Sequence, residues 1–187
     1  MSRLILACQT AADTLSRGDA FLGLAARAVF AAVLLGYYWA SGLAKLGDGV
    51  LGLFRPSVGA YAQIFPRAME AAGYDTGQLT FLHTLVVLAG TWAELILPLL
   101  IVIGLATRLA ALGMIGFVLL QSATDIFGHG LRSEPGGVGA WFDRVPDSLI
   151  MDQRLLWVFV LVVQVIRGAG PVSLDWLVQR WHSARQD

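Results

Sequence analysis

The stretch Phe81–Ile103 reads FLHTLVVLAGTWAELILPLLIVI, and it decides the fold of this chain. A helix of about 20 apolar residues crosses the hydrocarbon core of a bilayer, so this run is long enough to span a membrane. Glu94 lies deep within it, and an ionisable carboxyl at that depth must face protein or water because it is costly in lipid. The stretch therefore predicts a membrane bundle with a polar interior, without naming a reaction.

Composition places the whole chain among membrane proteins. Of its 187 residues, 57% are hydrophobic and 14% are charged, whereas a soluble domain carries about 25% charged residues. The formal net charge is zero, so a nucleic-acid partner has no electrostatic support. Cys8 is the only cysteine, which excludes an internal disulfide and a C-x-x-C redox pair. The length favours one domain over residues 1–187.

Three further apolar runs complete the predicted spans. Continuous apolar runs favour helices, because a sheet in lipid must close into a barrel. We therefore predict an all-α fold, a four-helix transmembrane bundle with spans at about residues 21–46, 81–103, 106–127 and 153–168. The fourth run is at or below the usual minimum of about 17 residues unless the residues before it continue the helix.

Segments outside the spans carry amphipathic patterns. The connection 47–80 holds the apolar run VGAYAQIF among prolines and glycines, which is typical of an interfacial or re-entrant segment. Ser173 can cap a C-terminal helix in which apolar residues recur at i, i+3, i+4 and i+7 over residues 174–181. We expect amphipathic interfacial helices at both ends and in the first long loop. For the C-terminal helix, packing on a partner subunit is the alternative.

Four spans put both termini on one side of the membrane. The basic residues divide almost evenly between the two sides, which is a weak signal. However, Arg108 lies in a very short turn, where the positive-inside rule is most reliable. We therefore expect both termini in the cytoplasm.

Helical rise orders the charged residues of the spans by depth. At about 1.5 Å per residue, Arg27 lies roughly 9 Å and Glu94 roughly 14 Å from the inner edge, with Arg108 just beyond that edge. Arginine side chains are long enough to cover the remaining gap. We predict that these three residues form an inner polar layer, in which Glu94 pairs with Arg27, Arg108 or both.

A second polar group is predicted near the outer edge. Lys45 ends the first span, and His83 begins the second. Gln121 and Asp125 lie one turn apart near the end of the third span, and His129 follows four residues later. We expect these five residues to form an outer polar layer.

These groups have structural and functional interpretations. Glu94 is the best candidate for a catalytic or proton-relay residue, although a structural ion pair that fixes helix register is the simpler interpretation. His83 and His129 could bind a metal with Asp125, but interfacial histidines are more often hydrated, and we predict no metal site. No glycine-rich phosphate loop, Ser/His/Asp constellation or H-E-x-x-H motif is evident in the sequence.

An aromatic cluster, formed by Tyr37, Tyr38 and Trp39, lies in the first span. Such residues usually form an interfacial belt or a packing surface. The alternative is that they line a pocket for a quinone ring, which makes all three candidate quinone-contact residues.

Several of these features, in this order, resemble the DoxX family of small bacterial membrane proteins. The resemblance extends from about Arg27 to Leu177. Its matching parts are Arg27 and Gly36 in the first span, the segment SGLAKL with Lys45, the segment AELILPLLIVIGLATRLAAL with Glu94, Gly104 and Arg108, and the tail GAGPVSLDWL.

The resemblance implies a four-span protein of the bacterial inner (cytoplasmic) membrane. Some relatives are the membrane subunit of a thiosulfate-oxidising, quinone-reducing enzyme, and others are linked to oxidant defence or to maturation of periplasmic redox proteins. We expect an accessory subunit that anchors or organises a redox protein partner. We expect this subunit to be non-catalytic rather than an enzyme.

Two alternatives remain open. In the first, the chain is a quinone-linked oxidoreductase subunit, with quinone as the candidate cofactor. The aromatic cluster or the outer layer would then bind the ring, and Glu94 or Asp125 would handle protons, because quinone reduction needs protons as well as electrons. The second alternative is a small transporter that uses the polar interior.

Overall fold

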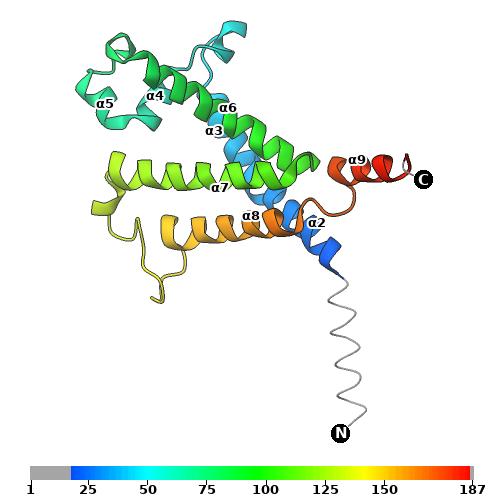
Figure 1. The fold of residues 1–187 in the computed structure, drawn as a ribbon. Helices are drawn as coiled ribbons and strands as arrows, with labels where there is room; N and C mark the ends of the chain where they lie inside the picture. The colour runs from blue at the N-terminus through cyan, green and yellow to red at the C-terminus, as the bar shows by residue number, and fades with distance from the viewer. Residues whose placement is uncertain (1–17, 186–187) are drawn as a thin grey trace.

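The computed structural model describes residues 18–185, and this part of the chain is helical (Figure 1). Its only extended pairing, within the described residues, is an isolated antiparallel bridge between Leu46 and Pro56. Four helices are long and apolar enough to cross a membrane, namely Phe21–Ala44, Phe81–Ile103, Thr107–Gly128 and Leu149–Arg167. These helices confirm the predicted all-α fold with four membrane-spanning segments. The amphipathic segment predicted at the N-terminal end lies largely outside the described residues.

The first span consists of α2 (Asp19–Phe30) and α3 (Gly36–Ala44). A π-helical turn at Ala31–Leu35 joins the two helices. Phe30, Leu34 and Tyr38 follow one another at four-residue spacing and are buried. Residues four apart lie on the same helix face, so this stripe faces the interior of the bundle while the remaining faces stay exposed.

A tight turn joins the second and third spans, α6 (Phe81–Ile103) and α7 (Thr107–Ala123). Gly104 ends α6 in the left-handed conformation with φ at 71°, and Ala106 is also left-handed with φ at 48°. The Gly104 amide donates to the Ile101 carbonyl and the Leu105 amide to the Leu100 carbonyl, which closes the end of α6. A π-helical turn at Thr124–Gly128 continues α7.

The fourth span begins earlier than residue 153, where the sequence analysis placed it. A π-helical segment at Leu149–Arg154 leads into α8 (Leu155–Arg167), and together they make 19 residues. Ser148 starts this segment, because its amide and its hydroxyl both donate to Asp152 Oδ2, at 2.9 and 2.6 Å. The preceding residues therefore do continue the helix, and the span reaches a length sufficient for a bilayer.

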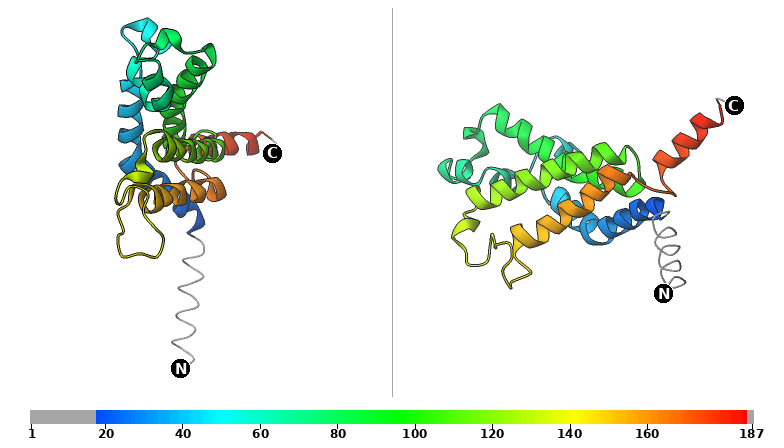
Figure 2. Two further views of the ribbon diagram at one scale, coloured as in Figure 1. Left: turned by 90° about the vertical axis from the view of Figure 1, so that its left-hand side faces the viewer. Right: turned by 60° about the horizontal axis from the view of Figure 1, so that its bottom comes forward.

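The four spans pack in a closed ring. The packed neighbours are α2 with α8, α8 with α7, α7 with α6, and α6 with α3. Both views in Figure 2 show α7 and α8 side by side. The centre of the ring is a core of buried apolar residues, which includes Phe30, Tyr38, Ile101, Met114 and Leu161.

The two ends of the bundle differ. At one end, here named the α4 end, α4 (Val58–Ile64) and α5 (Pro66–Ala71) pack on the first half of α6 through Tyr61, Met69 and Val87. At the other, named the α9 end, α9 (Leu174–Ser183) projects away from the bundle (Figure 1). Helices therefore occur in the first long loop and at the C-terminal end, as predicted, and their position at a membrane surface stays a prediction.

Candidate functional site

A buried ion pair lies between the first and second spans. Lys45 Nζ donates to Glu94 Oε2 at 2.6 Å, and each residue is only 3% exposed. Ser41 connects the two, because its hydroxyl accepts from Lys45 Nζ at 2.7 Å and donates to Glu94 Oε1 at 3.3 Å. Both carboxylate oxygens of Glu94 are thus satisfied by polar neighbours. We name these three residues the Lys45–Ser41–Glu94 triad.

Gly42 lets the two helices approach closely enough for this pair to form. A Cβ atom on Gly42 would lie 2.8 Å from Leu95 Cδ2 and 3.4 Å from Glu94 Cβ. A residue with a side chain would have to displace the Leu95 side chain next to Glu94. Lys45 follows Gly42 by three residues, about one helical turn, so its side chain reaches back to the carboxylate.

The structure corrects the predicted inner polar layer. Glu94 is buried, as expected, but it pairs with Lys45 and not with Arg27 or Arg108. Arg27 lies beside Gly104, where a Cβ atom would contact the guanidinium. Gly104 follows Glu94 by ten residues, about 15 Å along a helix. Direct charge coupling acts within about 4–6 Å, so Arg27 is too distant along α6 to serve as its partner.

Arg27 instead holds the segment that links α8 to α9. Its Nη2 atom donates to the Val172 carbonyl at 2.7 Å and to the Pro171 carbonyl at 3.4 Å. Gly23, one turn before Arg27, permits this contact, because a Cβ there would lie 2.7 Å from the Gly168 carbonyl oxygen. Arg27 and the tail GAGPVSLDWL, although far apart in the sequence, therefore form one structural unit.

The α9 helix is attached to the turn between α6 and α7 through Asp175. The backbone amides of Ala106 and Thr107 donate to Asp175 Oδ1 and Oδ2, at 2.7 and 2.9 Å. The Asp175 amide returns a hydrogen bond to the Gly104 carbonyl at 2.8 Å. A carboxylate at the start of α7 also interacts favourably with the helix dipole.

Replacing Asp175 by alanine should therefore loosen the α6–α7 turn. We expect a loss of about 1–2 kcal/mol, the usual cost of removing a helix cap. Hydrogen exchange followed by mass spectrometry should show faster exchange in peptides that contain Ala106 and Thr107. Ser183→Ala is the control, because its hydroxyl donates only to Gln179 within α9. Equal exchange in both variants would contradict the assigned role of Asp175.

The predicted outer polar layer is divided among separate contacts. His83 belongs to a capping box at the start of α6, with its Nδ1 atom 2.7 Å from Thr80 Oγ1. His129 Nε2 lies 2.9 Å from the Gln63 carbonyl oxygen. Neither histidine joins Asp125, and no three His, Cys, Asp or Glu side chains converge as metal ligands within the described residues. The five residues therefore do not form a single layer.

Asp125 has a partner outside the predicted polar layers, Arg154. Arg154 donates to the Asp125 carboxylate through Nη2, and to Ser122 Oγ through Nη1 at 3.0 Å. Arg154 is 3% exposed. The signal for this pair was present, because Arg154 lies inside the fourth span both as predicted from residue 153 and as it begins at Leu149.

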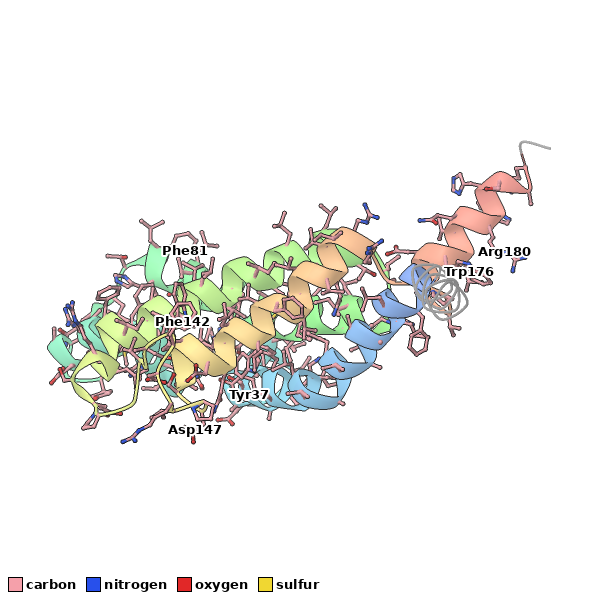
Figure 3. The ribbon with its side chains drawn as sticks, turned by 90° about the horizontal axis from the view of Figure 1, so that it is seen from below. Tyr37, Phe81, Phe142, Asp147, Trp176 and Arg180 are labelled. Atoms are coloured by element: carbon pink, nitrogen blue, oxygen red, sulfur yellow. The ribbon has the colours of Figure 1, made fainter. Side chains whose placement is uncertain are left out.

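The aromatic cluster mainly packs. Tyr38 is fully buried, and its ring meets those of Phe117 and Trp157 edge to face. Tyr37 lies beside α8 (Figure 3), with its ring 5.5 Å from that of Trp157, and its hydroxyl accepts from Gln121 Nε2 at 2.8 Å. Trp39 donates through Nε1 to the Leu95 carbonyl at 3.1 Å.

A groove between α6 and α7 reaches the triad. Its volume is about 590 Å³, and its wall is mostly apolar. Small residues hollow this wall, and the chain between α4 and α5 closes one end. The lining includes Ala89, Gly90 and Ala93 from α6, Gly113, Gly116 and Leu120 from α7, and Ile64 and Phe65 at the α4 end.

The groove is polar at its floor and opens sideways. Lys45 and Glu94 line it and are buried, whereas Val86 and Leu120 at its edge are 48% and 71% exposed. Gln121 and Asp125 also contribute to the lining. A Cβ atom on Gly116 would meet no other atom within 4 Å, so the space in front of this glycine is open. None of the three aromatic cluster residues is part of this lining.

Comparison with known proteins identifies the family. The DoxX family model matches residues 22–129, which contain nearly all of the first three spans, the triad and every described residue of the groove lining. This chain belongs to the DoxX family. No curated protein and no solved structure matches it. Family membership and four apolar helices make it a multi-pass integral membrane protein.

The match also divides the DoxX chain at a structural boundary. It ends at residue 129, before the fourth span and before the tail that Arg27 holds. The likeness of that tail to the family therefore stays an expectation. Within the bundle, the unmatched α8 packs on both α2 and α7, so the matched residues alone do not close the ring.

Proposed function

We propose that this DoxX protein is the membrane subunit of a redox assembly and that it binds a quinone-class molecule in the groove between α6 and α7. The observation that carries this proposal is the sideways opening of an apolar groove onto the buried Lys45–Ser41–Glu94 triad. In a membrane-spanning bundle this opening faces acyl chains, from which a lipid-soluble molecule enters without crossing water.

The groove suits a ring with polar edges. Ligand sites typically have volumes of about 300–1,000 Å³ and combine apolar walls with a few polar groups. Ala93, Gly113 and Gly116 leave room for a flat ring between α6 and α7, and Glu94 and Lys45 lie at the floor. When bound, a quinone would supply an acceptor for two electrons and two protons, with the electrons coming from the redox partner. The aromatic cluster is not required, because it lies outside the lining.

The triad can hold and move a proton within the groove. Lys45 Nζ and Glu94 Oε2 are 2.6 Å apart, so a proton passes between them along a single short hydrogen bond. Ser41 Oγ, which contacts both residues, gives a second route through its hydroxyl. Two charges in a low-dielectric site can neutralise each other by this transfer, since buried ions are costly. Glu94 is accordingly the proposed proton-handling residue.

A second candidate function is the anchoring of a redox partner without ligand binding. The observation that favours it is the exposed apolar face of α9, where Leu177, Val178 and Trp181 are each about half exposed. A partner subunit that covers this face would be held at the membrane. The two functions are compatible, because the α9 helix and the groove entrance are formed by different residues.

We infer that the protein lies in a bacterial inner membrane with the α9 end in the cytoplasm. Four spans put both termini on the same side. Arg108 lies directly after the short α6–α7 turn at the α9 end, where basic residues favour the cytoplasm.

Filling the groove should abolish ligand binding. We expect Gly116→Leu to raise the Kd for a soluble ubiquinone analogue at least tenfold, about 1.4 kcal/mol, because the new side chain occupies the open space. Binding is measured by equilibrium dialysis of the purified full chain in mild detergent. Gly36→Leu is the matched control, since Gly36 is also helical and a Cβ added there would meet no atom within 4 Å, but it lies outside the lining. Unchanged binding in Gly116→Leu, or equal loss in both variants, would reject the quinone site.

A further inference from the structure

A second cavity lies at the α9 end, far from the triad along the spans. Its volume is about 630 Å³, and it is bounded by the start of α7, the end of α8, the α8–α9 link and α9. Its lining includes Thr107, Arg108, Arg167, Asp175 and Trp176. It shares no residue with the groove between α6 and α7.

One cationic group of the cavity, Arg108, faces little competition from acids. Arg108 makes no hydrogen bond or ion pair with any of residues 18–185. Among the described residues of the lining, Asp175 is the one acid, and both its oxygens already accept from the amides of Ala106 and Thr107. The Thr107 hydroxyl is buried and has no hydrogen-bond partner in the described part of the chain. The lining therefore offers unused donors to an anion.

The cavity also lies at the level of the lipid headgroups. Arg108 is the second residue of α7 and Arg167 is the last residue of α8, so both mark the ends of spans. Next to them on α7, Leu109 and Leu112 are 74% and 57% exposed and face outward from the bundle. An arginine at a span end, beside exposed leucines, lies where phosphate groups meet acyl chains.

The adjoining helix has the composition of a membrane-surface helix. Arg180 stacks over Trp176 with its guanidinium carbon 4.6 Å from the ring centroid, and Arg185 stacks over Trp181 at 3.6 Å. Figure 3 shows Trp176 and Arg180 together on α9, away from the bundle. Surface helices that combine tryptophan and leucine with arginine bind anionic bilayers.

We propose that the cavity at the α9 end binds the headgroup of an anionic phospholipid. Arg108 and Arg167 contact its phosphate, with the Thr107 hydroxyl available as an additional donor. One acyl chain lies along Leu109 and Leu112 on the outer face of α7, and Trp176 packs at the level of the glycerol backbone. Such a lipid would tie together α7, α8 and α9, three elements that meet at this cavity.

Lipid selectivity of the full chain tests this site. Native mass spectrometry in mild detergent measures the Kd of the first bound dioleoylphosphatidylglycerol and of dioleoylphosphatidylcholine. We expect the wild type to prefer the anionic lipid and Arg108→Gln to lower that preference about fivefold, the effect of one surface charge near an anionic headgroup. Arg108→Lys, which keeps the charge, should retain most of the preference. Arg132→Gln, an exposed arginine at the α4 end, should leave it unchanged.

Four results would overturn the proposal. The first is an unchanged preference in Arg108→Gln, and the second is an equal loss in Arg132→Gln. The third is full competition by glycerol 1-phosphate, which has no acyl chain and would identify the ligand as a soluble anion. An equal loss in Arg108→Lys and Arg108→Gln would assign Arg108 a packing role instead, and would also reject phosphate binding.

Discussion

Lys45→Met should destabilise the protein by about 3–5 kcal/mol, because it leaves the Glu94 carboxylate buried without its cationic partner. Glu94 is 3% exposed and retains only the Ser41 hydroxyl in that variant. Glu94→Gln should have a similar effect on Lys45. The free energy of unfolding is measured by titration with sodium dodecyl sulfate from mild detergent, with loss of helical circular dichroism as the signal.

The double variant Lys45→Met/Glu94→Leu separates the ion pair from simple packing. Removing both charges leaves no unpaired ion, so this variant should be more stable than either single variant. Leu85→Ala, on an exposed part of α6, is the control and should cost much less. If the double variant loses the sum of the two single losses, then Lys45 and Glu94 do not interact energetically.

The same variants bear on function. Under the proposed function, Lys45→Met/Glu94→Leu restores stability but removes the proton-handling residues from the groove floor. A stable protein that still binds the ubiquinone analogue, but no longer supports its reduction by the redox partner, would fit proton handling by Glu94. A stable double variant with full activity would leave Glu94 with a structural role alone.

Hydropathy was sufficient to predict the fold. Each span is a continuous apolar run, and a polypeptide in lipid must satisfy its backbone within helices, so Phe81–Ile103 was placed without any tertiary information. The error at the fourth span has a local cause. Asp152, Gln153 and Arg154 interrupt the apolar pattern, yet Ser148 and Asp152 begin a helix there.

The partner of Glu94 could not be predicted from depth alone. The predicted depth of each residue was counted from the end of its own span. This count assumes that all spans end at the same depth in the membrane. In the structure α6 extends well past the end of α3 and carries α4 on its first half, so the end of α3 meets the middle of α6. Lys45 is thereby level with Glu94, although the sequence places it at the end of its span.

Contacts between residues close together in the sequence could be predicted from their spacing. Thr80 and His83 have the spacing of a capping box, so the role of His83 was accessible without a structure. The groove could not be predicted from the sequence, because its wall consists of small residues from two different helices. These are Gly113 and Gly116 on α7, and Ala89 and Ala93 on α6. Small residues in a span equally predict close helix packing, and only the arrangement of α6 and α7 distinguishes a hollow from a contact.

Gly104→Ala should be the most damaging of the small substitutions, with a loss of about 2–4 kcal/mol. Gly104 has φ at 71°, and the left-handed conformation costs other residues about 1–2 kcal/mol. The added methyl group would also lie 2.5 Å from Ser173 Cβ and against the Arg27 guanidinium. It would therefore disturb both the turn between α6 and α7 and the contact of Arg27 with the Val172 carbonyl.

The expected consequence is release of α9 together with lower stability. Limited trypsin digestion should cleave the α8–α9 link after Arg167 faster in Gly104→Ala than in the wild type, and the midpoint of unfolding should fall. Gly36→Ala is the matched control, because Gly36 is helical with φ at −61° and a Cβ there meets no atom within 4 Å. Alanine is the better helix former, so this variant should be neutral or slightly more stable. Equal stability and equal cleavage in the two variants would show that α9 is not held at Gly104.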